Sequence, residues 1–302
     1  MRSKGLPKST IVRARVSALR AGFGLAEKLA PSLGGRYATR LWLTVPPAPP
    51  VPAGPADGES FDIRVGGGAV RGMSFGSGPS VYLMHGWGGV GGQLSAFVDP
   101  LRAAGYRVIL FDGPSHGGSD PGACGPGRTH GVEFAAALTA TMDRFGPADA
   151  VIAHSMGALP SLMTHRDGLS VGRFVLLAPM RDLSTHLDRF AVQVAMGTRT
   201  RRAMNERIAR LVGQPVTGMD VRLLAGAAAP VPLLVVHDRG DRETSHAHSV
   251  QLVESWSGPA SMISTDGLGH RRLLTDPSVV DQVVDFVGLA ADRDQARTAA
   301  LA

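Results

Sequence analysis

The serine at position 155 stands where an apolar run gives way to a string of small residues. The run 150–154 precedes it, and Met156, Gly157 and Ala158 follow it. Such a pattern is typical of a sharp turn from a strand into a helix, which lifts a serine hydroxyl clear of a sheet. We therefore expect Ser155 to be a nucleophile, and the alternative is that its hydroxyl only caps the helix that follows.

A serine hydroxyl is a weak nucleophile near neutral pH, so it needs a base within hydrogen-bond reach and an acid that orients the base. Two later segments supply candidates. The apolar run 231–237 leads directly into Asp238 and Asp241, and the next apolar run leads into a loop that contains His270. Both acids come just after a predicted strand, so Asp238 competes with Asp241 for the orienting role.

Apolar runs of strand length alternate with helical patterns over most of the chain. Strands are expected at 61–65, 70–75, 81–85, 106–112, 150–154, 174–178, 231–237 and 262–265. Helices are expected at 93–104, 131–145, 156–165, 246–256 and 278–289. The first two strands form a hairpin through Gly66, Gly67 and Gly68. The alternation predicts an α/β fold with a mostly parallel sheet that carries helices on both faces, and apolar strands without period-two alternation agree with burial on both sides.

One gap between strands is longer than the others. Residues 181–229 offer about three helical stretches, including 183–196 and 201–212, and no strand. Ligands bind at the carboxyl ends of the strands in open α/β sheets, and we predict that the insertion forms a small helical lid there. Its apolar side chains either line an acyl pocket or seat the lid on the core: Leu183, Leu187, Phe190, Val194 and Met196. Its arginines are expected to be a solvated face.

The positive charge of the chain is concentrated at its start. The formal net charge is +6, but the first 45 residues carry nine basic side chains against one acidic side chain, Glu27. Residues 1–45 are expected to form a basic arm with an amphipathic helix. The arm could pack on the body of the protein, contact a partner or second subunit, or associate with a membrane surface. The remainder is slightly acidic, which argues against nucleic-acid binding.

Composition excludes several other kinds of protein. The single cysteine, Cys124, rules out an internal disulfide and a cluster of several thiolates, and it is expected to be a bystander. No apolar run reaches the length of a membrane span, and a cytoplasmic location fits this composition. No phosphate-binding glycine loop is found. We expect no cofactor and no metal, and the close pair His246 and His248 would point to different sides of a helix.

Four separated motifs resemble those of the α/β-hydrolase fold family, over roughly residues 61–290. His85-Gly86-Trp87-Gly88-Gly89 resembles the oxyanion loop of the family, and the segment from Phe111 to Ser119 resembles the turn usually written D-x-P-G-H-G-x-S. His154-Ser155-Met156-Gly157 resembles the nucleophile elbow, and the loops with Asp241 and His270 complete the set in the family's chain order. The chain departs from the family at Ala153 and Ser115, where glycines are usual, and at Asp238, where a His-Gly pair is common.

The resemblance implies an eight-stranded, mostly parallel sheet with a helical lid inserted after strand six. It also implies a carboxylesterase-like or lipase-like serine hydrolase that acts on a small ester, thioester or similar acyl substrate. Ser155 would attack the acyl carbon, His270 would move the proton, and Asp241, favoured over Asp238 by the family's loop spacing, would orient His270. The backbone N–H groups of Trp87 and Met156 would form the oxyanion hole. An acyltransferase with the same triad and a catalytically silent binding protein are the alternatives.

The expected organisation follows from these assignments. The basic arm spans residues 1–45, a Pro-rich linker spans 46–58, the hydrolase core comprises 59–180 and 230–290, the lid spans 181–229, and a C-terminal tail spans 291–302. His85, His116, His154 and His237 lie at strand ends or turns, where we expect them to make structural hydrogen bonds.

Overall fold

The computed structural model describes residues 8–51 and 54–299, with side chains described for 13–51 and 54–288. Arg2 and Lys4 of the predicted arm and residues 300–302 of the predicted tail lie outside the described residues. The chain divides into two compact units. Of the described residues, the helical unit contains those up to Thr44 together with Asp182–Met219, and the sheet unit contains those between Val45 and Arg181 together with those from Asp220 onward.

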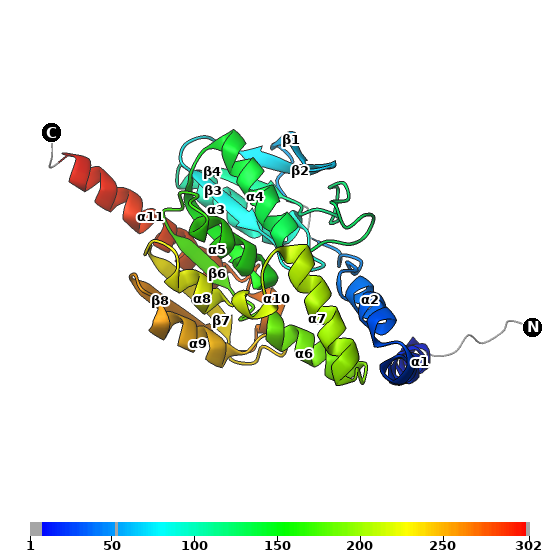
Figure 1. Ribbon diagram of the computed structural model, residues 1–302. Coiled ribbons are helices and arrows are strands. Elements are labelled where there is room, and N and C mark those ends of the chain that lie inside the picture. Colours follow the sequence, from blue (N-terminus) through cyan, green and yellow to red (C-terminus); the bar gives the residue numbers. More distant parts are fainter. Residues whose placement is uncertain (1–7, 52–53, 300–302) are drawn as a thin grey trace, which may run out of the picture. The chain divides into compact units, whose positions relative to one another are not determined.

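The sheet unit is built on one sheet of eight strands (Figure 1). The strands are β1 (Glu59–Val65), β2 (Gly68–Phe75), β3 (Ser80–Met84), β4 (Arg107–Phe111), β5 (Ala148–His154), β6 (Phe174–Leu177), β7 (Leu233–Asp238) and β8 (Ala260–Thr265). Their order across the sheet is β1-β2-β4-β3-β5-β6-β7-β8. The hairpin of β1 and β2 is antiparallel, β2 pairs antiparallel with β4, and β3 to β8 run parallel. The predicted eight-stranded, mostly parallel sheet is confirmed.

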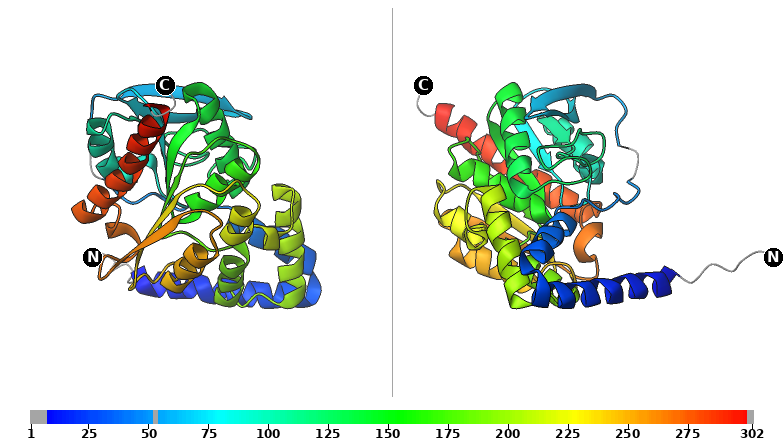
Figure 2. Two further views of the ribbon diagram at one scale, coloured as in Figure 1. Left: turned by 90° about the vertical axis from the view of Figure 1, so that its left-hand side faces the viewer. Right: turned by 45° about the vertical axis from the view of Figure 1, so that its right-hand side comes forward.

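Helices cover both faces of this sheet (Figure 2). One face carries η1 (Gly91–Phe97), α3 (Val98–Ala103) and α11 (Pro277–Ala299), and the other carries α4 (Gly131–Phe145), α5 (Ala158–Arg166), α8 (Val221–Gly226) and α9 (His246–Ser255).

The last helix was expected to end at residue 289 before a separate tail. Instead α11 continues to Ala299, because the segment 290–299 contains no proline or glycine that would stop it.

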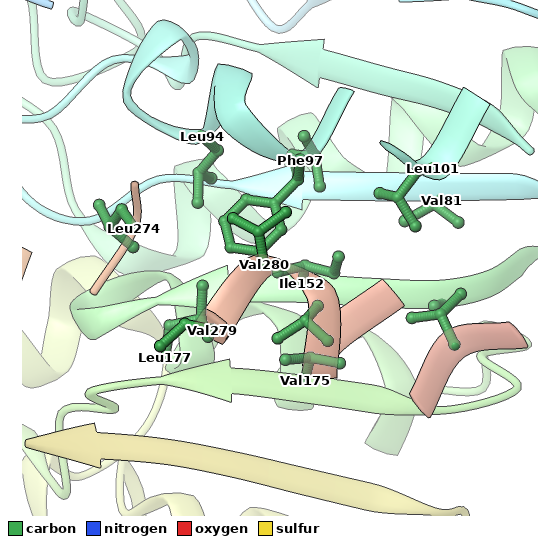
Figure 3. Packing of buried hydrophobic residues seen from close by; sticks show 14 of the residues in the cluster. Val81, Leu94, Phe97, Leu101, Ile152, Val175, Leu177, Leu274, Val279 and Val280 are labelled. Atoms are coloured by element: carbon green, nitrogen blue, oxygen red, sulfur yellow. The ribbon is translucent and has the colours of Figure 1, made fainter. Parts of the chain in front are cut away.

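The core between the sheet and the first set of helices is made of alternate strand residues. Val81, Ile152, Val175 and Leu177 point from three neighbouring strands toward Phe97 of η1 and its neighbours (Figure 3). All five side chains are fully buried. Burial of an aliphatic side chain of this size contributes about 1.5–3 kcal/mol, so this layer holds the strands, and therefore the loops at their ends, in a defined register.

The helical unit joins segments that are far apart in the sequence. It consists of α1 (Lys8–Leu29), α2 (Pro31–Trp42), α6 (Leu183–Gln193), α7 (Thr198–Val212) and η3 (Val216–Gly218). The arm was expected to contain one amphipathic helix, and it contains two. Pro31 lies at the start of α2, and the residue before a proline is disfavoured in helical conformation, so the chain breaks at Ala30, whose φ is −153°.

Two consecutive glycines let α2 approach α7 closely. A Cβ atom on Gly35 would lie 2.7 Å from the Cβ of Ala203, and a Cβ atom on Gly34 would lie 2.9 Å from both Ala26 and Thr200. The rings of Trp42 and Phe190 meet nearby with centroids 5.5 Å apart. The arm and the insertion are therefore packed as one helical bundle, which differs from the predicted separate arm and lid.

The expected lid, 181–229, is divided between the two units. Residues 182–219 belong with the N-terminal helices, whereas α8 belongs with the sheet unit. The reason is that α8 buries Val221, Leu224 and Ala225 and packs against α5 and α9. Whether the inserted helices act as a lid stays a prediction.

An open apolar groove of about 680 Å³ lies between α1 and α2. It is lined by Arg15, Ala18, Leu19, Gly22, Phe23, Ala26, Leu33, Gly34, Tyr37 and Leu41. This groove is contained within the helical unit and includes none of the three predicted triad residues. None of the helices described has the length and apolar character needed to cross a bilayer.

Glu27 of α1 supports the first turn of α7. Its two carboxylate oxygens accept hydrogen bonds from the backbone N–H groups of Arg199, at 2.9 Å, and Thr200, at 2.8 Å. These N–H groups have no partner inside their own helix. The hydrogen bonds, led by that from Thr200, lower the pKa of Glu27 below its ordinary value of 4.5. The ionised form therefore stabilises the folded helical unit.

We predict that Glu27→Gln destabilises the helical unit, because an amide keeps only one acceptor oxygen for the two N–H groups. A depressed folded-state pKa contributes stability that is fully present above the unfolded value of 4.5 and is lost as pH falls through the folded value. The rate of limited proteolysis within 182–219 should therefore rise in the variant at neutral pH, and the difference from wild type should shrink in acid. Glu206→Gln, on the exposed side of α7, is the matched control; equal proteolysis of the two variants would contradict the capping role.

Candidate active site

The backbone at Ser155 adopts a left-handed conformation. Its φ is +52°, although it carries a side chain. It follows β5 directly and begins the short helix η2 (Ser155–Gly157), which continues into α5. A non-glycine residue at positive φ is strained and persists only where its surroundings hold it. One such contact is the hydrogen bond from the Met180 N–H to the Ser155 carbonyl oxygen, at 3.1 Å. The predicted sharp turn is confirmed, and it closes with Ala153 in place of the usual glycine.

Small residues let the turn approach the neighbouring strand. A Cβ atom on Gly157 would lie 2.7 Å from the carbonyl oxygen of His85, which real Cβ atoms do not tolerate. A Cβ atom on Gly86 would lie 3.0 Å from the Cβ of Ser155. The loop after β3 and the turn after β5 can therefore lie in direct contact, as the predicted oxyanion loop requires.

His270 lies beside the Ser155 hydroxyl. Its Nε2 is 3.0 Å from Ser155 Oγ, and its Nδ1 is 2.7 Å from Asp241 Oδ2. A carboxylate can only accept, so Nδ1 carries the proton and Nε2 accepts the hydrogen bond from the serine. His270 was expected on a loop, but it lies in the short helix α10 (Gly269–Arg272), which follows β8 after a tight turn at Gly267 and Gly269.

Asp241 is surrounded by hydrogen-bond donors, although its side chain is fully buried. Oδ1 accepts the backbone N–H groups of Glu243, at 2.7 Å, and Thr244, at 3.1 Å. Oδ2 accepts the Thr244 hydroxyl at 2.9 Å and lies 3.2 Å from His237 Nε2, in addition to its bond with His270. Burial opposes ionisation, but the hydrogen bonds from His237 and His270 outweigh it and hold the pKa of Asp241 well below its usual range.

His237 is the supporting residue that the sequence alone did not reveal. It was expected to make only structural hydrogen bonds, and it does so by linking Asp241 to the rest of the fold. His237 Nε2 lies 3.2 Å from the Asp241 carboxylate, which can only accept, so Nε2 carries the proton and Nδ1 accepts from the Ser249 hydroxyl at 2.6 Å. The available signal was the spacing, because His237 lies near the end of β7, four residues before Asp241, and Thr244 follows three residues after Asp241.

Asp238 has a different task from Asp241. It is fully buried at the end of β7. Its Oδ2 accepts the Leu268 N–H at 2.8 Å and the Thr265 hydroxyl at 2.9 Å, and its Oδ1 accepts the Gly240 N–H at 2.8 Å. These bonds tie the loop after β7 to the loop after β8. The geometry therefore assigns the position beside His270 to Asp241, as the loop spacing favoured.

His154 supports His270 from behind. Its Nε2 donates to the carbonyl oxygen of His270 at 2.9 Å, and the two rings lie with centroids 4.7 Å apart. Burial lowers the pKa of His154 to about 3. The neutral His154 ring therefore holds the backbone of α10 in place without putting a positive charge beside the His270 ring.

The predicted oxyanion loop after β3 is held by two neutral histidines. The Gly88 N–H donates to His116 Nε2 at 3.0 Å, and the Gly113 N–H donates to His85 Nε2 at 2.9 Å. Burial lowers the pKa of each ring to about 4, so both nitrogens can accept at neutral pH. The Gly89 N–H is bonded to the Gly86 carbonyl oxygen at 3.1 Å. The N–H of Trp87, next to Gly86, makes no such bond to any residue that the structure describes.

The turn that contains His116 accommodates Ser115, which stands where the family usually has a glycine. Ser115 adopts a φ of +63°, the conformation that the usual glycine would supply. Its hydroxyl donates to the Arg128 carbonyl oxygen at 2.9 Å, and its N–H donates to the Asp120 carbonyl oxygen at 3.0 Å. The hydroxyl bond, which glycine could not make, offsets part of the cost of the strained backbone.

Comparisons with known proteins agree with this architecture. Residues 79–202 match the family model described as alpha/beta hydrolase fold. No curated protein sequence matches the chain. The structure is similar to an esterase of Pyrococcus furiosus, with a TM-score of 0.63 and 18% identity over 83% of this chain and 97% of that one. It is also similar to an esterase of Exiguobacterium antarcticum, with a TM-score of 0.58 and 16% identity over 76% of this chain and 99% of that one.

A third similar structure is the thioesterase domain from the curacin biosynthetic pathway, with a TM-score of 0.54 and 16% identity over 76% of this chain and 98% of that one. Identities this low show the fold alone. The predicted resemblance to the α/β-hydrolase fold is confirmed.

We predict that Asp238→Asn lowers the free energy of unfolding by about 2–3 kcal/mol, because an amide nitrogen would face an N–H group that a buried carboxylate oxygen now accepts. Equilibrium urea denaturation of both proteins measures the difference. Asp266→Asn, which changes an exposed carboxylate that forms an ion pair with Arg239, should change stability little. An Asp238→Asn midpoint equal to that of Asp266→Asn would show that the buried carboxylate does not hold the two loops together.

Proposed function

We propose that this chain, which has the α/β-hydrolase fold, is a serine hydrolase of the carboxylesterase or lipase-like kind. Its substrate is an ester, thioester or similar small acyl compound, and the reaction passes through an acyl-enzyme. The observation that carries the proposal is the relay from Ser155 through His270 to Asp241, with distances of 3.0 and 2.7 Å.

The chemistry follows from the two faces of the His270 ring. As the Ser155 oxygen attacks the acyl carbon, Nε2 takes the hydroxyl proton and then gives it to the leaving alcohol or thiol. The carbon–heteroatom bond breaks, and the acyl group stays on the serine oxygen. Water then attacks the acyl carbon with Nε2 as the base, which releases the acid and restores the serine. No cofactor is needed for this sequence.

Asp241 makes His270 a better base because it stabilises the ring once the ring has taken a proton. The ring becomes positively charged when it takes the proton, and the carboxylate 2.7 Å from Nδ1 stabilises that charge. The five donors around Asp241 keep it ionised and in place. An acid held in this way also fixes the tautomer that leaves Nε2 free to accept.

The oxyanion would be stabilised by backbone N–H groups. Met156 directly follows the nucleophile at the start of a helix, where N–H groups lack partners within the helix. Trp87 lies in the loop that contacts the turn, and the N–H groups of Gly88 and Gly89 are already engaged. We therefore assign the oxyanion hole to the N–H groups of Met156 and Trp87.

Acyl esters and thioesters are also the substrate classes suggested by the similar structures. Two of these are named as esterases and one as a thioesterase domain. These names support the acyl class for this chain and do not select an acyl length.

The experiment is hydrolysis of a series of p-nitrophenyl esters and acyl thioesters of increasing chain length by wild type and by Ser155→Ala. Wild type should release free acid in equimolar amount with the leaving group. Ser155→Ala should lose turnover by at least about 10³-fold with its thermal midpoint retained, because the variant keeps the fold but has no nucleophile. Ser261→Ala, an exposed serine on β8, is the matched control and should keep wild-type rates. Activity retained in Ser155→Ala would end the proposal.

A second prediction separates the two acids. Asp241→Asn should lower kcat by about 10³–10⁴-fold, because the amide can hold the His270 ring in the wrong tautomer. Asp238→Asn, assayed below its melting range, should keep most of its kcat, since that carboxylate contacts loop backbone and not His270. Steady-state kinetics on the best ester of the series measures both. Equal losses in the two variants would contradict the assigned roles.

A further inference from the structure

We propose that Cys124, His130 and Glu133 form a binding site for a transition-metal ion of the zinc type. The thiol, a ring nitrogen and a carboxylate oxygen of these residues all lie within 4.8 Å of one another. This site is separate from the Ser155 relay and does not depend on the proposed hydrolase function.

The three residues come from two adjoining segments of the sheet unit. Cys124 lies in the Gly-rich and Pro-rich loop between β4 and α4, His130 is the residue that precedes the first turn of α4, and Glu133 lies in that turn. Each of them is half-buried. His130 has an extended backbone and Glu133 a helical one, and their ligand atoms nevertheless lie within 4.8 Å of each other and of the Cys124 thiol.

The carboxylate of Glu133 is already oriented by its neighbours. Its Oε2 accepts the hydroxyl of Thr129 at 2.6 Å, and its Oε1 accepts the backbone N–H of Cys124 at 3.2 Å. Thr129 is fully buried. Metal-binding carboxylates in proteins are commonly oriented by such outer hydrogen bonds. The pair of bonds draws the Cys124 backbone to the carboxylate, which places the thiol within reach of it.

His130 brings a polar atom that the rest of the fold does not use. Its Nδ1 is buried and has no hydrogen-bond partner in the described part of the structure. Buried polar atoms of native proteins are almost always paired. A ligand that accepts a nitrogen lone pair would satisfy a ring nitrogen at this position, and a metal ion does so.

The mixed donor set selects the class of ion. Thiolate and imidazole ligands suit Zn²⁺ and related transition metals, whereas Mg²⁺ and Ca²⁺ prefer oxygen donors only. Three protein ligands leave one position of a tetrahedral ion for water. A single cysteine excludes a cluster of several thiolates, but it is sufficient for this mixed site.

A bound ion would tie the loop to the start of α4. The same loop carries Ser115, whose hydroxyl donates to Arg128, and His116, which accepts the Gly88 N–H of the predicted oxyanion loop. The ion would thus stabilise the segment that supports that loop.

The test is titration of tag-free, chelator-treated full-length protein with Co²⁺, followed by competition with Zn²⁺. We expect one Co²⁺ per chain, with a thiolate-to-metal charge-transfer band and d–d bands that Zn²⁺ abolishes.

Cys124→Ser should remove the charge-transfer band and weaken Zn²⁺ binding by at least about 100-fold. Thr129→Val should retain the band and weaken binding by about 10-fold, because only the orientation of Glu133 is disturbed. Glu254→Gln, which removes an exposed carboxylate on α9, should bind like wild type.

Circular dichroism establishes that each variant is folded, and Glu133→Gln replaces Cys124→Ser if the latter does not fold. The proposal is overturned if saturating Co²⁺ gives no thiolate band, or if Zn²⁺ binding is equally strong in wild type and Cys124→Ser. Binding that is lost in His270→Ala but kept in Cys124→Ser would assign the metal to the Ser155 relay instead, which also overturns it.

Discussion

The strained turn at Ser155 is the constraint on which the candidate site depends. A parallel sheet brings the carboxyl ends of β3, β5, β7 and β8 to one edge, but adjacency at an edge does not by itself bring a hydroxyl to an imidazole. The positive φ at Ser155 turns the side chain out of the strand direction, and α10 places His270 opposite it. The cost of the strained backbone is met by the surrounding packing, including the close approach that Gly86 and Gly157 permit.

Buried charge is the second constraint, because the site places an ionised acid where water cannot reach it. An isolated carboxylate there would be costly. Asp241 is instead surrounded by backbone N–H groups, a hydroxyl and two imidazoles, each of which favours the ionised form. Asp238, three residues earlier, uses the same principle for a different purpose, since it accepts the N–H of Leu268 on the loop that carries His270 toward Ser155. One acid orients the ring and the other orients the loop.

Local sequence patterns predicted the sheet and the candidate relay because each feature lies within a short window. An apolar run, a small-residue turn after Ser155 and acids just past β7 are visible without tertiary structure. Contacts between distant segments were not predictable in this way. The packing of Gly34 and Gly35 on α7 joins the N-terminal arm to the insertion, and the link from His237 to Asp241 depends on how the loop after β7 folds back. The same limit applies to Cys124, whose neighbours His130 and Glu133 are recognised only once the loop is folded.

The central claim is that Ser155 is an activated nucleophile, and stoichiometric labelling tests it most directly. Intact protein treated with a fluorophosphonate and analysed by mass spectrometry should gain one adduct per chain, located on the peptide that contains Ser155. The labelling rate should fall sharply in His270→Ala, because the serine then has no base. If wild type gains no adduct at large reagent excess, or if the adduct forms at the same rate without His270, the relay seen in the structure does not activate the serine and the account is contradicted.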